Sequence, residues 1–402
     1  MTAHDGQPPP SGGGDRDPLD AAPAATSFAA RARRIHDRLP VIDGHNDLPW
    51  ELRTRAGSDL DLADPRGDLR GYHTDVPRLL RGGVGGQFWS VYVPARSEAP
   101  LRDTIEQVML VRRMVERDPD QLALAVTADD IVRIRAEGRI ACLMGAEGGH
   151  SIEGSLGALQ ALAALGVRYL TLTHADSHDW ADSATDDARH GGLAAFGEEV
   201  VHEMNRLGMM VDVSHVSADT MRHAIRVSDA PVIASHSSAR ALADHPRNVP
   251  DDVLTMIGEK GGVVMVNFYP GFVVAATAER AQGMFSMARR LRARFGPDED
   301  TAFEQAMQDL VAARDWDRGS VRDVADHIEH IADVAGVDHV GLGSDFDGVD
   351  MTPEGLDDVS CYPAITEELL RRGWSDGDVL RVLGENLLAV MRQVEEVAAA
   401  TR

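Results

Sequence analysis

The chain has 402 residues, 43% of them hydrophobic, which is enough to bury a large core in one or two domains. Forty Lys and Arg against 65 Asp and Glu leave a net charge of −25, and such a field repels the phosphates of nucleic acid and the headgroups of anionic lipid. We therefore expect neither nucleic acid nor a membrane as a partner.

The two ends of the chain carry no targeting pattern. Residues 1–30 open on a Pro-, Gly-, Asp- and Ala-rich stretch with no basic start and no apolar core, so we expect a disordered tail there. The last residues, VEEVAAATR, form no hydrophobic anchor, and no apolar run approaches the roughly 20 residues that span a bilayer. The only cysteines, Cys142 and Cys361, lie in unrelated contexts, which predicts free thiols in a reducing compartment. We expect a soluble, cytoplasmic protein.

From residue 40 onward, short apolar or β-branched runs alternate with longer stretches of helical period, a pattern typical of βα units around a parallel sheet. Eight such units favour a closed (β/α)8 barrel over an open doubly wound sheet. Neither a G-x-G-x-x-G motif after the first run nor a Walker loop supports nucleotide binding. Residues 31–402 are thus expected to form a single barrel domain. The runs lie at 40–47, 86–93, 140–147, 167–174, 209–215, 231–236, 262–269 and 339–347.

The longest interruption of this pattern lies at about 270–325, between the seventh and eighth runs. It is rich in Arg, Met, Glu and Ala at helical spacing, and a structureless loop of that length is uncommon inside a compact domain. We expect one or two extra helices there. They cover the site, form a subunit contact or merely elaborate the surface, and the sequence does not choose among these.

Side chains able to bind a metal stand at the C-terminal ends of at least six of the eight runs. In a β/α barrel these ends meet on one face, where catalytic residues are placed. The sequence therefore predicts one site assembled from most of the chain. The seven residues are His45, Asp47, Glu147, His174, His215, His236 and Asp345.

The residue types at these ends suit zinc. His45 and Asp47 are separated by one residue, so the alternation of a strand points both into the barrel mouth, and an imidazole with a carboxylate can bind zinc. Glu147 ends an apolar run, where a carboxylate is costly unless a cation compensates it, and its two oxygens could bridge two ions. His215 and His236 each end a buried-looking strand and offer imidazoles for a second ion, although either alone would more often be a core histidine.

Two further histidines follow these positions closely. His150 comes three residues after Glu147, and His178 comes four residues after His174. Partners that hydrogen-bond a metal ligand from behind fix its orientation. We expect His150 and His178 to be candidates for that role.

Seven motifs appear in the order found in the renal (membrane) dipeptidase family, which the chain resembles from about residue 35 to 390. By this resemblance the fold is a β/α barrel with two zinc ions per chain. His45 and Asp47 would bind the first ion, Glu147 would bridge, and His215 and His236 would hold the second. His174 would polarise the scissile carbonyl, Arg247 would bind the substrate carboxylate, and Asp345 would shuttle protons. The motifs are VIDGHNDLPW, GAEGGHSIEG, LTLTHADSH, FGEEVVHEMNRLGMMVDVSHVS, ASHSSAR, HPRN and GLGSDFDG.

The resemblance implies hydrolysis of dipeptides that have a free C-terminal carboxylate, with L-D dipeptides among the candidates, by attack of a metal-bridging hydroxide. The membrane anchor and paired cysteines of the animal enzymes are missing here, so their location and linkage do not carry over; a homodimer stays open. The alternatives are an amidohydrolase-like barrel acting on another amide, a lactone or a phosphoester, and a metal-binding scaffold without catalysis. Asp345 speaks against a scaffold, which needs no proton shuttle.

Overall fold

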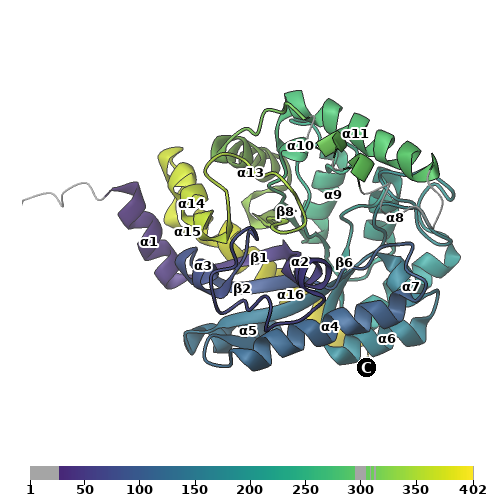
Figure 1. Cartoon of the computed structure of the whole chain (residues 1–402), viewed down its shortest axis with the longest axis horizontal. Helices are drawn as coiled ribbons and strands as arrows, with labels where there is room; N and C mark the ends of the chain where they lie inside the picture. Colours follow the sequence, from purple (N-terminus) through teal and green to yellow (C-terminus); the bar gives the residue numbers. More distant parts are fainter. Residues whose placement is uncertain (1–26, 295–304, 308, 312–313, 402) are drawn as a thin grey trace, which may run out of the picture.

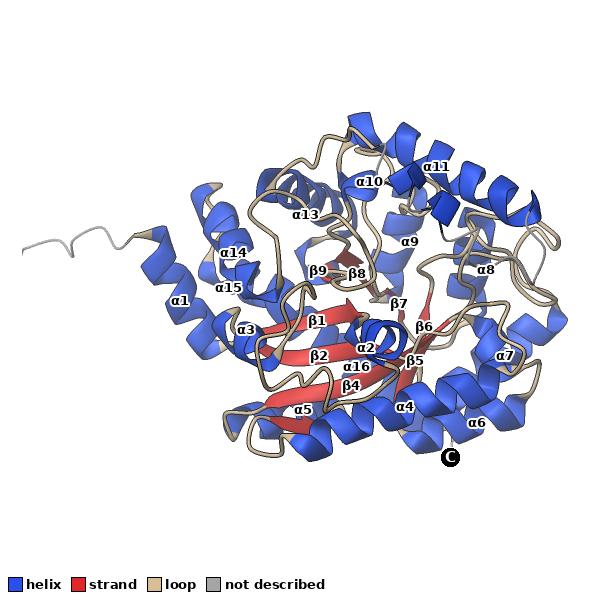
Figure 2. Ribbon diagram, in the orientation of Figure 1, coloured by secondary structure: helices blue, strands red, loops and turns tan. Residues whose placement is uncertain are grey.

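The computed structural model describes residues 27–294, 305–307, 309–311 and 314–401, and the predicted tail at 1–30 falls almost entirely outside them. Its centre is a closed barrel of eight parallel strands ringed by helices, the (β/α)8 fold that the sequence predicts (Figures 1 and 2). The strands pair in the order β2-β1-β9-β8-β7-β6-β5-β4, and pairing of β2 with β4 closes the ring. All of these pairings are parallel.

Each of the eight predicted runs overlaps a strand of the barrel, although β2 begins two residues before its run. A ninth strand, β3, was not predicted, because three residues are too few to show a period. β3 pairs with the first half of β4, and β5 pairs with the second half of β4 along the same edge. The strands are β1 Val41–Asn46, β2 Val84–Ser90, β3 Leu122–Leu124, β4 Ile140–Glu147, β5 Val167–Thr171, β6 Met210–Asp212, β7 Val232–Ala234, β8 Val263–Val266 and β9 Val340–Leu342.

Helices connect successive strands and cover the outside of the ring. Local signals fix many of their ends: Thr127 and Ser320 each close a capping box, and Gly166 ends α6 in the left-handed conformation one residue before β5 begins. The longer helices are α1 Phe28–Arg38, α2 Leu48–Ala56, α4 Pro100–Arg117, α5 Ala128–Ala136, α6 Leu156–Leu165, α7 Ala195–Leu207, α8 Ala218–Val227, α9 Asp251–Lys260, α11 Ala275–Arg294, α13 Val321–Ala335, α14 Tyr362–Arg371 and α16 Asn386–Ala400. The short ones are α3 Val76–Arg81, α10 Pro270–Val273 and α15 Asp376–Leu380.

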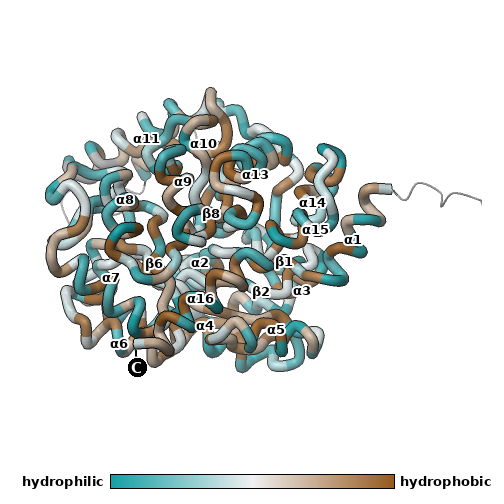
Figure 3. Tube along the Cα trace, turned by 180° about the vertical axis from the view of Figure 1, so that it is seen from behind, coloured by the Kyte–Doolittle hydropathy of each residue, from teal (hydrophilic) through white to brown (hydrophobic). Residues whose placement is uncertain are grey.

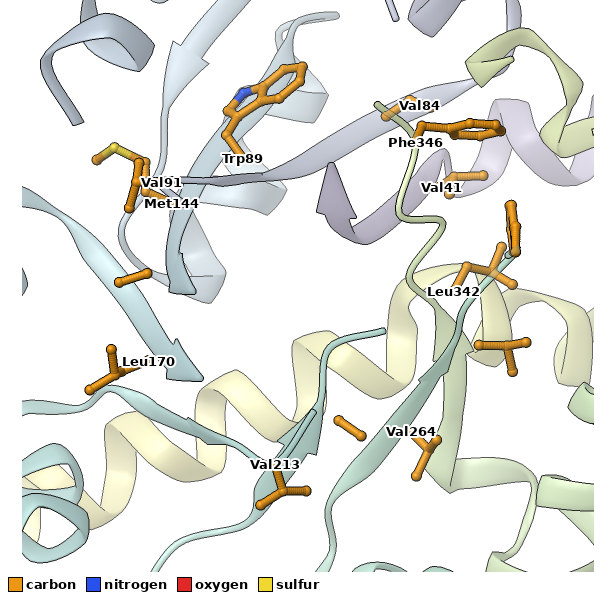
Figure 4. Close-up of a cluster of buried hydrophobic side chains, with 14 of the residues drawn as sticks. Val41, Val84, Trp89, Val91, Met144, Leu170, Val213, Val264, Leu342 and Phe346 are labelled. Atoms are coloured by element: carbon orange, nitrogen blue, oxygen red, sulfur yellow. The ribbon is translucent and has the colours of Figure 1, made fainter. Parts of the chain in front are cut away.

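The apolar core has two parts. Side chains from the strands and from the residues that follow them pack against the surrounding helices, and Figure 4 labels ten side chains of this cluster, among them Trp89, Leu170 and Val264. A second cluster joins residues such as Phe88 and Tyr169 to the apolar face of α16, which lies near the middle of the reverse view in Figure 3. The burial of whole strands explains why their sequences read as continuous apolar runs.

The predicted insertion does contain helices. α10 and α11 follow β8 directly, residues 305–307 and 309–311 are also helical, and α13 begins at Val321, so the described part of the interruption holds more helix than the one or two expected. α11 lies at the top of the molecule in Figure 1, beside α10.

Two smaller predictions can be checked in the same structure. Cys142 is buried and Cys361 is partly buried, and both are free thiols, as predicted. Among the described residues, no helix has both the length and the apolar character needed to cross a bilayer. The cytoplasmic location and the homodimer stay predictions.

Candidate active site

The C-terminal ends of the strands bring the seven predicted side chains together. His45 lies within β1, Asp47 is the N-cap of α2, and Glu147 is the last residue of β4. His174, His215, His236 and Asp345 lie two or three residues beyond their strands, so the predicted runs extend past the true strand ends. The backbone thus leaves the sheet before it delivers these four side chains to the barrel mouth.

Glu147 stands at the centre of the group, with its two oxygens facing different histidines. Oε1 lies 2.9 Å from Nε2 of His215 and 3.5 Å from Nε2 of His236. Oε2 lies 3.4 Å from Nε2 of His45 and accepts a hydrogen bond of 3.0 Å from the Ser90 hydroxyl. Burial opposes ionisation of Glu147, but the charge of His45 and the hydrogen bond from His215 hold its pKa well below the usual range. A carboxylate shared in this way can bridge two cations.

The backbone after Glu147 needs two glycines. Gly148 has a φ of 114°, which L side chains rarely adopt, and it turns the chain away from the strand. A Cβ on Gly149 would lie 2.4 Å from the carbonyl oxygen of Leu172. The backbone at this pair therefore passes too close to its neighbours for a residue with a side chain.

His45 presents its Nε2 atom to the site without a hydrogen-bond partner. The Tyr169 hydroxyl lies 2.8 Å from Nδ1 of His45 and donates to the carbonyl oxygen of Gly44 at 3.2 Å. Because that hydroxyl has one proton, Nδ1 of His45 must be the donor to Tyr169, which leaves Nε2 as the ring nitrogen that faces the site. Nε2 is completely buried, has no hydrogen-bond partner among the described residues, and lies 3.1 Å from Oδ2 of Asp47.

The donor set suits metal ions. Nε2 of His215 and Nε2 of His236 lie 2.9 Å apart, and burial, the largest cause, holds both pKa values well below the usual range, so both imidazoles are neutral. Neutral imidazole is the form that binds a metal. Three overlapping groups have ligand atoms that lie within 4.8 Å of one another: His45, Glu147 and His236; Glu147, His174 and His215; and His45, Asp47 and Asp345. The buried Nε2 of His45 and the nitrogen and oxygen donors around it fit bound metal ions.

Asp345 and Asp347 follow β9, and their backbones differ from the one that the sequence suggested. Both have left-handed φ angles, 64° and 65°, so neither is in a strand, although the predicted run extended to residue 347. Oδ2 of Asp345 accepts 2.8 Å from the Asn267 amide, whereas Oδ1 of Asp347 accepts 2.7 Å from the backbone N–H of His73. Burial, with the nearby Asp47 and Glu147 carboxylates, raises the pKa of Asp345 to about 8, and burial raises that of Asp347 to about 7.

Arg247 comes from the loop between β7 and α9 and is 2% exposed. Its guanidinium donates 3.3 Å bonds to the Ser237 hydroxyl and to the His236 carbonyl oxygen, and it lies 5.2 Å from the centre of the Phe272 ring. Burial lowers its pKa to about 10, so it remains charged near neutral pH. In the described part of the chain no carboxylate lies within 4 Å of it, an unusual state for a buried cation.

A cavity of about 420 Å³ joins these groups. It is lined by Asp47, Glu147, His174, His215, Arg247, Asp345 and Asp347, together with aromatic side chains that the sequence did not identify. Trp50 and Tyr92 form one wall, with ring centres 5.0 Å apart, and the Tyr92 ring lies 4.7 Å from that of His174. Phe272 of α10 and Phe285 of α11 also line the cavity, so the insertion does cover the site.

The residues that orient the candidate ligands are not the two histidines predicted for that role. His150 and His178 hydrogen-bond the carbonyl oxygens of Val93 and Leu172. Tyr169 bonds His45, and Ser235 bonds His236, with Asp212 behind Ser235. The carboxylate of Asp212 inside an apolar strand was a usable signal, by the reasoning applied to Glu147; nothing in the sequence marked Tyr169 or Ser235.

The chain was compared with known proteins. A family model described as membrane dipeptidase, peptidase family M19, matches residues 29–402. Dipeptidase verJ of Clonostachys rogersoniana is 40% identical over 383 residues, which cover 92% of this chain and 88% of that protein.

Solved structures agree with this match. The probable dipeptidase PvdM from Pseudomonas aeruginosa has a TM-score of 0.79 at 24% identity and covers 92% of this chain and 99% of its own, which shows the shared fold. A metallo peptidase from Rhodobacter sphaeroides, liganded with a phosphinate mimic of the dipeptide L-Ala-D-Ala, has a TM-score of 0.72 at 26% identity and covers 88% of this chain and 99% of its own. The chain therefore belongs to the membrane dipeptidase family, peptidase family M19, and is a dipeptidase of this metallopeptidase family.

Proposed function

We propose that this chain is a two-zinc enzyme that hydrolyses the peptide bond of dipeptides with a free C-terminal carboxylate, including L-D dipeptides. The observation that carries the proposal is Arg247, a buried guanidinium that lines the same cavity as Glu147 and has no carboxylate partner among the described residues. A planar guanidinium can donate two parallel hydrogen bonds to a carboxylate. A substrate carboxylate would supply the missing countercharge.

Five side chains would hold the ions. His45 and Asp47 would bind one, His215 and His236 the other, and Glu147 would contribute one oxygen to each, in keeping with the contacts of its two oxygens. When bound, two zinc ions would supply hydroxide at neutral pH and positive charge for the developing oxyanion. The mixed nitrogen and oxygen donor set is the one that zinc accepts.

Two further side chains would act on the peptide bond itself. His174 lines the cavity, with Nε2 3.7 Å from Oε1 of Glu147, and burial lowers its pKa. As a neutral imidazole it can donate one hydrogen bond to the carbonyl oxygen as negative charge develops there. Asp345, held by Asn267, would accept a proton from the attacking water and return it to the leaving amine.

The geometry favours a dipeptide over a longer chain. The carboxylate anchor at Arg247 and the peptide-bond site at Glu147 line a single cavity of about 420 Å³, at the small end of ligand pockets. A tripeptide would place either its carboxylate or its scissile bond away from its partner. The Rhodobacter sphaeroides relative, with its L-Ala-D-Ala mimic, supports a D-residue at the C-terminal position.

The test combines a metal analysis with matched substrates. The purified protein should contain close to two zinc ions per chain, lose activity in a chelator and regain it when zinc returns. L-Ala-D-Ala should be cleaved about 10- to 100-fold faster in kcat/KM than its C-terminal amide, because a hydrogen bond to a charged group is typically worth about 1.5–3 kcal/mol. Active protein without zinc would refute the metal assignment, and equal rates for acid and amide would refute the role of the carboxylate.

A further inference from the structure

A buried carboxylate lies behind the candidate metal ligands and takes no part in the mechanism above. Asp212 ends β6, is fully buried, and has no cationic side chain within 4 Å in the described ranges. Burying an anion without a countercharge is costly. Its surroundings therefore show what balances this charge.

Four donors from the chain fill the acceptor sites of Asp212. Oδ1 accepts the backbone N–H groups of Ser214 at 3.0 Å and Ser235 at 2.8 Å. Oδ2 accepts the hydroxyls of Thr171 at 2.5 Å and Ser235 at 2.6 Å. A carboxylate offers about four lone-pair directions, and all are used here, so this arrangement belongs to the ionised form.

The Ser235 hydroxyl links the Asp212 carboxylate to His236 through two hydrogen bonds. Its single proton goes to Asp212, since the 3.4 Å contact with the Ser214 hydroxyl is too long to compete. Ser235 Oγ lies 2.7 Å from Nδ1 of His236 and must therefore accept that ring's N–H. Nε2 of His236 is left with its lone pair directed at Glu147 and His215. The relay runs from carboxylate to hydroxyl to imidazole.

His45 is oriented by a different relay that contains no charge. Its Nδ1 donates to the Tyr169 hydroxyl, which donates to the Gly44 carbonyl oxygen. Gly145 makes room for this ring, since a Cβ there would lie 1.9 Å from Tyr169. The histidines of the two candidate ion positions thus have different hydrogen-bond partners. His236 is linked through Ser235 to an anionic carboxylate, whereas His45 is bonded to a neutral phenol.

We propose that Asp212 and Ser235 are positioning residues that make the ion position at His215 and His236 the tighter of the two, so that it fills first. The inference rests on the proposed two-ion site. An anion hydrogen-bonded behind an imidazole raises the basicity of its other nitrogen, and loss of such partners typically costs about 10- to 100-fold in metal affinity. A cation bound at His236 would also balance the buried Asp212 carboxylate.

The first experiment measures both zinc dissociation constants of the full chain by competition with a chelator of known affinity. Asp212→Asn keeps the size of the side chain and an oxygen for the Ser235 hydroxyl but removes the charge. It should weaken the tighter step about 10- to 100-fold and leave the weaker step within about twofold. Tyr169→Phe is the matched control on the neutral relay and should weaken only the weaker step. A role in folding alone would not separate the two steps.

The second measurement identifies the positions. Crystals grown with one equivalent of zinc and measured at the zinc edge should show anomalous density beside His215 and His236. Ser235→Ala should reproduce the effect of Asp212→Asn, and the double variant should be no worse than either single one. If Asp212→Asn does not fold, Ser235→Ala carries the test.

Three results would overturn the inference: first occupancy beside His45 and Asp47, equal weakening of both steps in Asp212→Asn, or constants unchanged in both variants. Failure of the proposed function would look different. In that case the parent protein itself would bind no zinc, whatever the variants do.

Discussion

Replacement of Asp345 by Asn tests the proton-transfer step with little disturbance of the fold. The Asn267 amide donates 2.8 Å to Oδ2 of Asp345, and the amide oxygen of an Asn can accept the same bond. The backbone N–H of Asp345 bonds the His45 carbonyl oxygen at 3.2 Å and is unaffected by the substitution. The structural cost should therefore be small, and a change in turnover reports on the carboxylate itself.

The expected loss follows from what a positioned acid–base group contributes. Burial and the neighbouring carboxylates raise the pKa of Asp345 to about 8. Cations bound beside Asp47 and Glu147 would lower this pKa toward neutral pH. A general acid–base group works best when its pKa lies near the working pH. We expect kcat to fall roughly 10²- to 10⁴-fold, or about 2.7–5.4 kcal/mol of barrier. Zinc content and affinity for a phosphinate mimic of the tetrahedral intermediate should be unchanged, because neither requires proton transfer.

The assay is steady-state turnover of a dipeptide from pH 5 to 10, with zinc analysis and inhibitor binding on the same samples. Asp347→Asn is the matched control. It should cost much less in kcat, since Asp347 is held by the His73 backbone rather than by Asn267. Turnover by Asp345→Asn at the parent rate across the pH range would refute the assignment and require another proton acceptor.

Three other changes give separate tests. Glu147→Gln should be the most damaging change to the metal ligands, because a neutral amide bridges two cations poorly; zinc analysis should show fewer than two ions per chain, and two ions with full activity would contradict the bridging role. Arg247→Ala should lower kcat/KM for dipeptides by a factor equivalent to about 1.5–3 kcal/mol and remove the preference for the free acid over the C-terminal amide. An unchanged preference would show that another residue recognises the substrate carboxylate. Burial raises the pKa of Asp347 from 3.8 to about 7 in the folded protein. As the pH rises from 4 to 7, Asp347 loses its proton in the unfolded chain but keeps it in the folded one, so the free energy of unfolding falls over this range. Metal-free Asp347→Asn should therefore unfold at higher denaturant than the parent at pH 8, by up to about 4 kcal/mol, with the difference vanishing toward pH 4.

The sequence by itself determined the architecture and which side chains lie together at the mouth of the barrel. Continuous apolar runs alternating with helical stretches predict parallel strands buried on both faces, and in a barrel the C-terminal ends of such strands meet. Polar residues placed there, such as His45, Glu147 and His236, could therefore be assigned to one site. The burial of a strand is visible in its own run of apolar residues, which is why the strands and the polar residues at their ends could be predicted. Arg247 depended on the resemblance alone, because an Arg in a loop has no local mark of burial.

Only the tertiary structure decided how these side chains are aimed. Strict alternation puts Asp43 and His45 on the same side of β1. In the structure Asp43 bonds Gln87, whereas His45 bonds Tyr169, whose ring packs on Phe88. Gln87 and Phe88 are successive residues of β2 and point to opposite sides, so Asp43 and His45 do so too. The β1–β2 register shifts between Asp43 and Asn46, which makes this possible.

The same holds for the contacts that support and cover the site. The relay from Asp212 through Ser235 joins the last residue of β6 to the residue after β7, and Phe285 reaches the cavity from a helix more than a hundred residues beyond Glu147 in the chain. Such contacts depend on strand register, left-handed residues and the closure of the ring. These are set by the packing of the whole chain, and no short segment of sequence contains them.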